Sequence, residues 1–244
     1  MMLNARFLIL AVIFFIATPW RSSAWAADDS AKFLQQYSKN KFTGEAKEYH
    51  QNGQLKQVCT FQEGVPEGRY LAYYENGSHQ SERNYSNGKL HGRYLEYYER
   101  EIPKEEGRYE NGEPIGTHKS YYENGHIKSE KDYRKSKLDG MVREYYEGNK
   151  LKSEGKFVGG LAEGTHKGYY DSGRQKYTYN FKKGKFDGLA KEYYSNNQIK
   201  IEGSLKNDKL IGMVREYFEN GVVKKEVVYS ATEQPERRSG ESPF

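Results

Sequence analysis

Aromatic residues recur along the chain at fixed distances from a leading glycine, with polar residues between them. Each leading glycine follows the previous one by 24 residues, and they are Gly44, Gly68, Gly92, Gly116, Gly140, Gly164, Gly188 and Gly212. With that glycine as position 1, position 6 is tyrosine in every copy, and position 7 is aromatic in every copy except the first, which has His50. A fixed period of about 20–50 residues is the signature of a repeat array. The pattern therefore predicts one array of eight repeats.

Each repeat carries the signal of a β-hairpin. Positions 9 and 10 are Asn-Gly in four copies, Asn52-Gly53, Asn76-Gly77, Asn124-Gly125 and Asn220-Gly221. Asn-Gly between aromatic or alternating runs favours a tight turn, because both residues accept a positive φ. An apolar residue at position 18 ends the second strand, and a second turn, often containing glycine, leads to the next copy. The predicted fold class is all-β, an elongated single array of antiparallel β-hairpins.

The size of the hairpin loop decides which side chains share a face of the sheet. A two-residue Asn-Gly loop puts positions 3, 7, 12 and 18 on a core face and positions 4, 6, 13 and 15 on an open face. A three-residue loop with a glycine bulge would instead bury the position-6 tyrosines. The first interpretation is preferred, because position 4 is mostly basic, position 13 mostly lysine and position 15 mostly glutamate.

This preferred interpretation predicts a binding surface made of tyrosine, lysine and glutamate. Its candidate residues are Tyr73, Tyr97, Tyr121, Tyr145, Tyr169, Tyr193, Lys128, Lys152, Lys176, Lys200, Glu130 and Glu154.

The repeats cover residues 44–229, and the segments on either side have different predicted roles. Lys32 and Tyr37 fall at positions 13 and 18 of a copy that would begin at residue 20. Residues 27–43 are therefore predicted to form a capping half-repeat, a half-hairpin that covers the first sheet edge. Residues 230–244 lose the pattern and have the composition of a disordered tail.

Two copies deviate at the hairpin tip. The third replaces Asn-Gly by a segment that ends in Ile102-Pro103, and the fifth has the reversed pair Gly148-Asn149. Loop tips tolerate change, so drift at a surface loop is the preferred explanation. A local binding feature near Pro103 is the alternative.

Residues 1–26 have the pattern of a cleaved signal peptide. Arg6 precedes the apolar run 7–20, and Ala24-Trp25-Ala26 supplies the small residues read by signal peptidase, with cleavage after Ala26. The run is short for a membrane span, which needs about 20 residues, and a retained anchor is the alternative. The expected location is therefore periplasmic or secreted.

Composition narrows the function classes. Only 35% of residues are hydrophobic but 15% are aromatic, and a disordered chain is poor in aromatic residues. Loss of residues 1–26 removes two arginines and no acid, which lowers the net charge from +5 to +3. This mixed-sign surface lacks the basic patch of a nucleic-acid binder. The lone Cys59 lies at position 16, where residues vary widely, and is interpreted as incidental.

The motif G-x-x-x-x-Y-Y-E-N-G, followed by K-x-E, an aromatic residue and a Gly-rich turn, resembles the variant MORN-repeat family of bacteria. The copies at Gly68 and Gly116 match it most closely, and the resemblance covers residues 44–229. It implies a chain of β-hairpins forming an extended, twisted antiparallel sheet. Many bacterial relatives carry an antitoxin label, and MORN arrays elsewhere look like membrane-apposed scaffolds. The family has no common catalytic residues.

The residues give no sign of catalysis, a metal site or a cofactor. No H-E-x-x-H, G-x-S-x-G or Walker A motif occurs. His118 and His166 share position 3 two copies apart, a separation of about 19 Å at four strand spacings, too far for a shared metal. The protein is therefore predicted not to be an enzyme.

Three functions remain open from the sequence. The leading prediction is an exported, non-enzymatic scaffold that binds another protein in the bacterial envelope, since tyrosine is enriched at protein interfaces. The second is a module for cell-wall glycan or membrane lipid, with tyrosines stacking on sugars or lysines facing headgroups. The third is an antitoxin-like protein that neutralises a toxin, although a signal peptide fits this role poorly.

Overall fold

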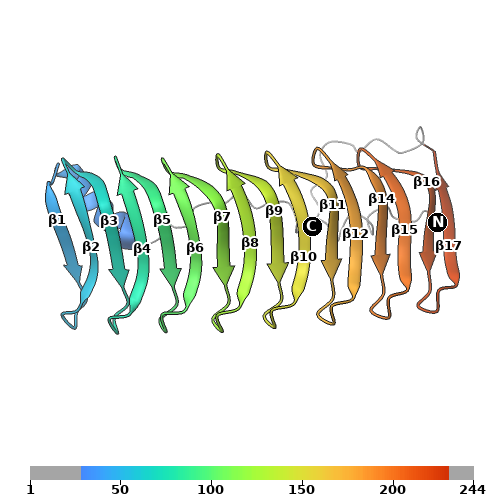
Figure 1. Ribbon diagram of the computed structural model, residues 1–244, viewed down its shortest axis with the longest axis horizontal. Helices are drawn as coiled ribbons and strands as arrows, with labels where there is room; N and C mark the ends of the chain where they lie inside the picture. The colour runs from blue at the N-terminus through green and yellow to red at the C-terminus, as the bar shows by residue number, and fades with distance from the viewer. Residues whose placement is uncertain (1–28, 231–244) are drawn as a thin grey trace. The chain divides into compact units, whose positions relative to one another are not determined.

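The computed structural model describes residues 29–230 and consists mainly of consecutive antiparallel β-hairpins (Figure 1). The chain divides into two compact units, residues 1–92 and 93–244, and each is described by itself. The predicted all-β array of hairpins is confirmed.

The first unit contains a helix and the first two hairpins. Its elements are α2 (Asp29–Lys39), β1 (Gly44–Tyr49), β2 (Leu55–Gln62), β3 (Val65–Tyr73), β4 (His79–Ser86) and the start of β5 (Lys89–Tyr97).

The second unit contains the end of β5 and the remaining strands. These are β6 (Pro103–Glu110), β7 (Glu113–Tyr121), β8 (Ile127–Arg134), β9 (Lys137–Tyr145), β10 (Leu151–Val158), β11 (Leu161–Tyr169), β12 (Gln175–Lys182), β13 (Lys185–Phe186), β14 (Gly188–Tyr193), β15 (Ile199–Lys206), β16 (Lys209–Tyr217) and β17 (Val223–Tyr229).

The hairpin loop has three residues, so the preferred two-residue loop is wrong. Between β3 and β4 the Tyr74 amide donates to the Ser78 carbonyl at 2.9 Å, and the Gly77 amide donates to the Tyr74 carbonyl at 2.9 Å. Gly77 has φ 84°, the left-handed conformation that a three-residue hairpin with a glycine bulge requires. The other hairpin tips repeat these bonds, including those of the third and fifth copies, where Glu101 and Asn149 adopt φ 58° and 63°. The altered sequences therefore keep the same turn.

A second bulge follows the loop and cancels the one-residue shift in strand pairing that the loop introduces. In the second copy Tyr73 pairs with His79, but Ala72 pairs with Ser81, so Gln80 at position 13 has no opposite residue. This extra residue restores the register that the longer loop had shifted by one. Positions 4, 6 and 15 therefore share the open face as predicted. The alternative, in which the position-6 tyrosines are buried, is wrong, since Tyr49 is exposed and the other seven remain partly exposed to solvent.

The core face is built from positions 3, 14, 16 and 18, with position 23 beside them. Fully or nearly buried examples are Ala46, Cys59, Phe61, Tyr70, Ser81, Tyr85, Tyr133, Val142, Ser153, Phe157, Tyr179, Leu205 and Val214. Positions 3 and 18 were predicted correctly. Positions 7 and 12 are only half-buried or exposed, because the bulge at position 13 brings positions 14 and 16 into the core instead.

Position 16 is not tolerant, contrary to the interpretation of Cys59. A Cβ atom at Gly107 would lie 2.3 Å from the ring of His118, and one at Gly155 would lie 2.2 Å from the ring of His166. Glycine at position 16 thus makes room for a ring at position 3 of the next copy. Cys59 itself is 0% exposed, and burial raises the pKa of its thiol to about 12. It is a core residue of the first unit.

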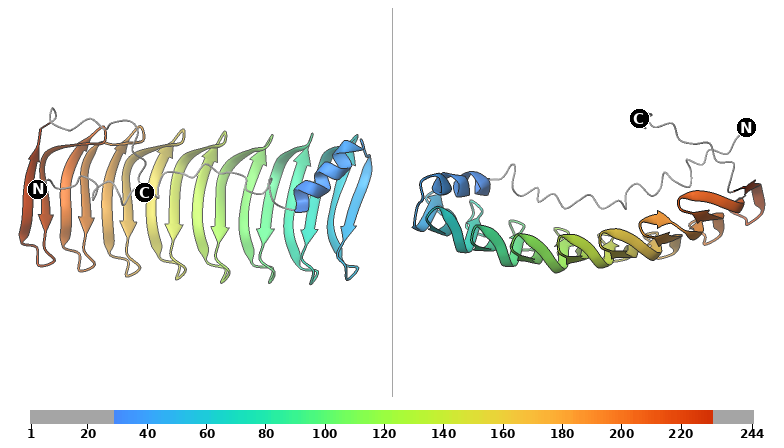
Figure 2. Two further views of the ribbon diagram at one scale, coloured as in Figure 1. Left: turned by 180° about the vertical axis from the view of Figure 1, so that it is seen from behind. Right: turned by 90° about the horizontal axis from the view of Figure 1, so that it is seen from above.

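The predicted half-hairpin cap is wrong, because residues 29–39 form helix α2. The helix lies across one face of the first unit (Figure 2) and buries Phe33 and Leu34. The Phe33 ring lies 6.1 Å from that of Phe61 and 6.5 Å from that of Tyr70. Asp29 in the first turn and Lys39 in the last suit the helix dipole. The segment therefore covers the core face of the first unit rather than its edge.

The predicted signal peptide and residues 231–244 of the predicted tail lie outside the described residues. Within residues 29–230, no helix has both the length and the apolar character needed to cross a membrane.

Candidate interaction surface: the Tyr–Glu ladder

Tyrosines at position 6 reach back along the open face to glutamates at position 15 of the preceding copy. In the second unit the hydroxyl-to-carboxylate hydrogen bonds run from Tyr121 to Glu106 (2.6 Å), Tyr145 to Glu130 (3.0 Å), Tyr169 to Glu154 (3.1 Å) and Tyr217 to Glu202 (2.8 Å). We call this series the Tyr–Glu ladder. Each rung joins two consecutive repeats.

Three of these glutamates, and Glu226 at position 15 of the last copy, pair with a basic residue at position 4 of their own hairpin, whereas Glu106 has Leu95 there. The nitrogen-to-oxygen distances are 3.5 Å for Lys119–Glu130, 3.8 Å for Arg143–Glu154, 3.0 Å for Lys191–Glu202 and 2.6 Å for Arg215–Glu226. Residues at positions 4 and 15 are directly opposite in the register, as for Lys119 and Glu130. Most ladder carboxylates are therefore held by a cation on one side and a phenol on the other.

These contacts perturb the ionisation of the ladder. Burial raises the pKa of Tyr145 and Tyr169, and the glutamate that accepts each hydroxyl adds to the effect. Burial alone would raise the pKa of Glu202, but its hydrogen bonds from Lys191 and Tyr217 outweigh this and lower it. At neutral pH the phenols of Tyr145 and Tyr169 are therefore protonated donors, and the Glu202 carboxylate is a charged acceptor.

The structure joins some of the predicted surface residues and separates others. Tyr121, Tyr145 and Tyr169 belong to the ladder with Glu130 and Glu154. Tyr73 and Tyr193 lie at the same position, but Val58 and Thr178 replace the glutamate before them. Tyr97 lies half-buried at the end of β5.

The predicted lysines lie elsewhere. Their ammonium groups sit over aromatic rings at position 7 of the same copy: Lys128 over Tyr122 (5.5 Å to the ring centroid), Lys152 over Tyr146 (5.8 Å), Lys176 over Tyr170 (5.6 Å) and Lys200 over Tyr194 (6.0 Å). Their assignment to the open face beside position 6 is wrong, because position 13 is the bulged residue.

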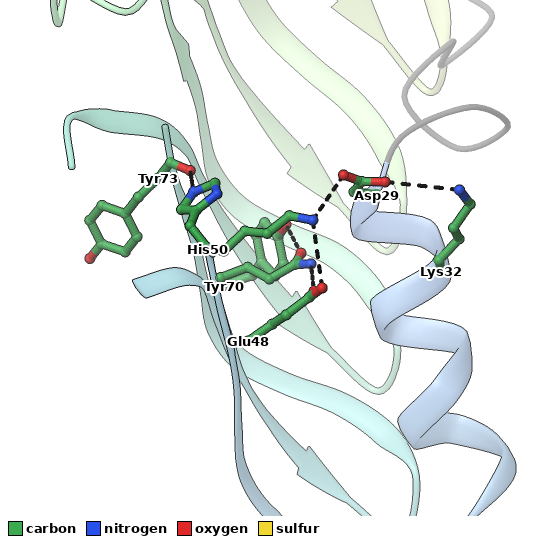
Figure 3. Close-up of polar contacts among 8 residues, drawn as sticks. Asp29, Lys32, Glu48, His50, Tyr70 and Tyr73 are labelled. Atoms are coloured by element: carbon green, nitrogen blue, oxygen red, sulfur yellow. Dashed lines mark hydrogen bonds and ion pairs between the residues drawn. The ribbon is translucent and has the colours of Figure 1, made fainter. Parts of the chain in front are cut away.

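Position 7 has a structural role that the sequence reasoning missed. Its hydroxyl donates to the main-chain carbonyl of position 6 in the next copy: Tyr98 to Tyr121 (3.0 Å), Tyr122 to Tyr145 (2.8 Å), Tyr146 to Tyr169 (2.8 Å), Tyr170 to Tyr193 (2.6 Å) and Tyr194 to Tyr217 (2.9 Å). In the first copy His50 Nε2 donates to the Tyr73 carbonyl at 3.0 Å (Figure 3). The signal was present, since every residue at position 7 except the last, Phe218, carries a donor.

The hairpin tips add a second link between copies. Asn52 Nδ2 donates to the Glu75 carbonyl at 2.8 Å, and Asn196 Nδ2 donates to the Glu219 carbonyl at 2.8 Å. Together with the position-7 bonds they set the spacing of the hairpins, and hence of the ladder.

The buried histidines are core residues. His118 Nε2 donates to the Arg108 carbonyl and His166 Nε2 to the Lys156 carbonyl, each at 2.9 Å. Burial lowers the pKa of both rings. Within residues 29–230, no group of three or more histidine, cysteine or acidic side chains is arranged to hold a metal ion.

Comparison with known proteins identifies the repeat. The family model described as MORN repeat variant matches residues 42–63, 66–87, 114–135, 138–158, 186–207 and 210–231. The segments left between these matches still form the strands β5, β6, β11 and β12 of the same pattern. A search of curated proteins finds no match.

Among solved structures, a chain of the crystal structure of TcdB2-TccC3-Cdc42 is 11% identical, with a TM-score of 0.16. The alignment covers 70% of this chain but only 13% of that one, so this chain spans a small part of its length.

Proposed function

The chain belongs to the family of MORN repeat variants, and on this premise we propose that it is a non-enzymatic scaffold that binds another protein after export to a bacterial envelope. The site we assign to this binding is the open face that carries the Tyr–Glu ladder.

The observation that carries the proposal is the preorganisation of the ladder. Each rung holds a tyrosine ring by its hydroxyl, as Tyr145 is held by Glu130 at 3.0 Å, and leaves part of the ring exposed. Tyrosine offers a large contact area with a polar tip, and ordering the ring before binding reduces the entropy lost on association. A row of such rings on consecutive hairpins suits a protein partner.

The charge of the ladder supports a protein partner over a lipid surface. Three of the four ladder glutamates pair with a lysine or arginine of their own hairpin, as Glu202 pairs with Lys191 at 3.0 Å, so the ladder carries little net charge. Attraction to anionic lipids depends on excess positive charge near the membrane. Both tryptophans of the chain lie within residues 1–26, and tryptophan is the ring that sugar-binding modules favour.

Affinity capture with the full chain tests this function. Immobilised wild type is exposed to native envelope extract, and bound proteins are identified by mass spectrometry. A triple variant, Tyr121→Ser, Tyr145→Ser and Tyr169→Ser, removes consecutive ladder rings. A matched control changes the exposed Lys137, Lys185 and Lys209 to Ser, since these lie at position 22, away from the ladder.

The proposal expects one protein to be enriched by the wild type and by the control, and to be lost by the ladder variant. If the ladder variant enriches the same protein as the wild type, the ladder is not the binding site. Enrichment of no protein, together with binding to purified cell wall or anionic vesicles, would favour the ligand-binding alternative.

Export has its own test. Mass spectrometry of the protein from its native source should find an N-terminus after Ala26, and an intact N-terminus would contradict cleavage.

A further inference from the structure

The Tyr–Glu ladder is incomplete at its C-terminal end. Glu226 in β17 accepts a hydrogen bond from Arg215 Nε at 2.6 Å, but among residues 29–230 no further repeat follows β17 to supply a tyrosine. Its side chain is 46% exposed, compared with 20% for Glu202 and 21% for Glu130, which lie between a cation and a phenol. The last acceptor of the ladder is thus open to solvent.

The N-terminal end lacks the complementary group. Tyr49 in β1 occupies position 6 of the first copy, where later tyrosines donate to a glutamate of the copy before. No repeat precedes β1 among the described residues, and Tyr49 is 57% exposed. One end therefore has a carboxylate without its phenol, and the other a phenol without its carboxylate.

Both ends are also edge strands. In the part of the chain that the structure describes, β1 pairs with β2 and β17 pairs with β16, which leaves one side of each strand unpaired (Figure 1). Such an edge is a template for pairing with another chain. Val228 in β17 is 71% exposed, although most copies have a polar residue at its position.

We propose that β17 of one molecule pairs with β1 of a second copy, antiparallel and in the register of the repeat, so that the ladder continues from chain to chain. The occupant of each edge is a second copy of this protein. The contact is heterologous, since different surfaces meet, and it can propagate.

The register between the last two copies defines this contact. There Ile201 pairs with Glu216, Glu202 with Arg215, Ser204 with Ile211 and Leu205 with Leu210. Moved on by one repeat, the same positions set Lys225 opposite Glu48, Glu226 opposite Lys47, Val228 opposite Thr43 and Tyr229 opposite Phe42 of the second copy.

Each of these pairs is favourable or neutral. Opposite charges meet twice and two aromatic residues meet once, which are the cross-strand pairs that stabilise a sheet. The side-chain sizes also fit at the core face, where Val227 at position 16 would face Ala46 at position 3 of the second molecule. Within the chain, Tyr179 and Ala190 occupy the same two positions of consecutive copies. The phenol of Tyr49 would then reach the open side of Glu226.

A symmetric pairing of β17 with itself fits less well. If two β17 strands pair antiparallel with their core faces on the same side, one residue near the middle of the strand lies opposite the same residue of the other molecule. The central residues of β17 are Lys225, Glu226 and Val227, so a pair centred on Lys225 or on Glu226 would set like charges opposite each other.

The junction between chains is expected to be weaker than one within a chain. Phe218 occupies position 7 of the last copy and has no hydroxyl to donate to the next carbonyl, unlike Tyr194 one copy earlier. Assembly should therefore be reversible and depend on concentration.

Directed cross-linking of the full chain tests the register. Thr43→Cys and Val228→Cys are made as separate variants, at exposed positions, and native Cys59 is buried. The proposal expects a disulfide-linked dimer when the two variants are mixed with a mild oxidant, and none with either variant alone. A dimer of Val228→Cys alone, a dimer of Thr43→Cys alone, or no dimer in the mixture would each overturn it.

Charge reversal supplies an independent readout. In sedimentation velocity, Lys47→Glu and Glu226→Lys should each lose the oligomers of the wild type, and an equimolar mixture of the two should recover them. The exposed Lys137→Glu serves as the control and should assemble like the wild type. Oligomers that persist in both single variants would contradict the proposed pairing.

Discussion

The phenol of Tyr146 donates a 2.8 Å hydrogen bond to the main-chain carbonyl of Tyr169, which lies in the next repeat. The neighbouring residue Tyr145 points to the other face and donates to Glu130 of the preceding repeat. Two adjacent tyrosines thus connect a hairpin forwards through the backbone and backwards through the open face. The pair explains why both positions are aromatic.

Tyr146→Phe should destabilise the protein, because the Tyr169 carbonyl loses its donor while the ring and its lysine remain. The expected loss in free energy of unfolding is about 1 kcal/mol, measured by urea denaturation followed by circular dichroism. Tyr193→Phe is the matched control, since Thr178 stands where its glutamate would be, and should change stability by less than about 0.5 kcal/mol. Equal losses in both variants would contradict the linking role of position 7.

Gly155→Ala should be strongly destabilising, because the added Cβ would lie 2.2 Å from the His166 ring. Overpacking of this kind costs about 1–3 kcal/mol. Gly148→Ala is the control, since nothing lies within 4 Å of its added Cβ. Combining Gly155→Ala with His166→Ala should recover part of the lost free energy of unfolding. A double variant that recovers none would contradict the size complementarity between positions 16 and 3.

Acid should weaken the fold through His118 and His166. Burial lowers the pKa of both rings, so the unfolded chain binds protons more readily than the folded one. Their contribution is fully present above the unfolded pKa of about 6.5 and is lost as the pH falls from there toward the folded value. In chemical denaturation at a series of pH values, His166→Gln should show a smaller loss of stability below pH 6.5 than the wild type. An unchanged slope would contradict this assignment.

The ladder should be visible in the titration of its tyrosines. Burial raises the pKa of Tyr121, and the hydrogen bond to Glu106 adds to the effect. Glu106→Gln removes the negative charge, so NMR titration should find a lower Tyr121 pKa in this variant. Tyr133 should keep its pKa of about 12, since burial is the main cause there. An unchanged Tyr121 pKa in the Glu106→Gln variant would contradict the hydrogen bond between Tyr121 and Glu106.

The array itself could be predicted from the sequence, because the leading glycine and the paired aromatics keep strict register from Gly44 to Tyr229. The faces were harder, since the three-residue loop and the bulge at position 13 each shift the register and cancel for position 6. Alternation along the strand cannot reveal two compensating shifts.

Other features were misread for physical reasons. Asp29, Phe33, Leu34 and Lys39 carry a helix signal, but Lys32 and Tyr37 match the repeat spacing by coincidence. The varied residues at position 16 suggested tolerance, whereas the glycines there leave room for a side chain of the next copy, as Gly155 does for His166. Such pairing involves residues 11 positions apart and is invisible to a reading of one position at a time.

Tyrosine footprinting by hydroxyl radicals, on the full chain with and without the captured protein, tests whether the Tyr–Glu ladder is the binding surface. Binding is expected to protect Tyr121, Tyr145 and Tyr169 on the open face, while Tyr122 and Tyr146 at position 7 keep their reactivity. Protection of the position-7 tyrosines with unchanged ladder tyrosines would place the partner on the other face and rule out the ladder as its binding site.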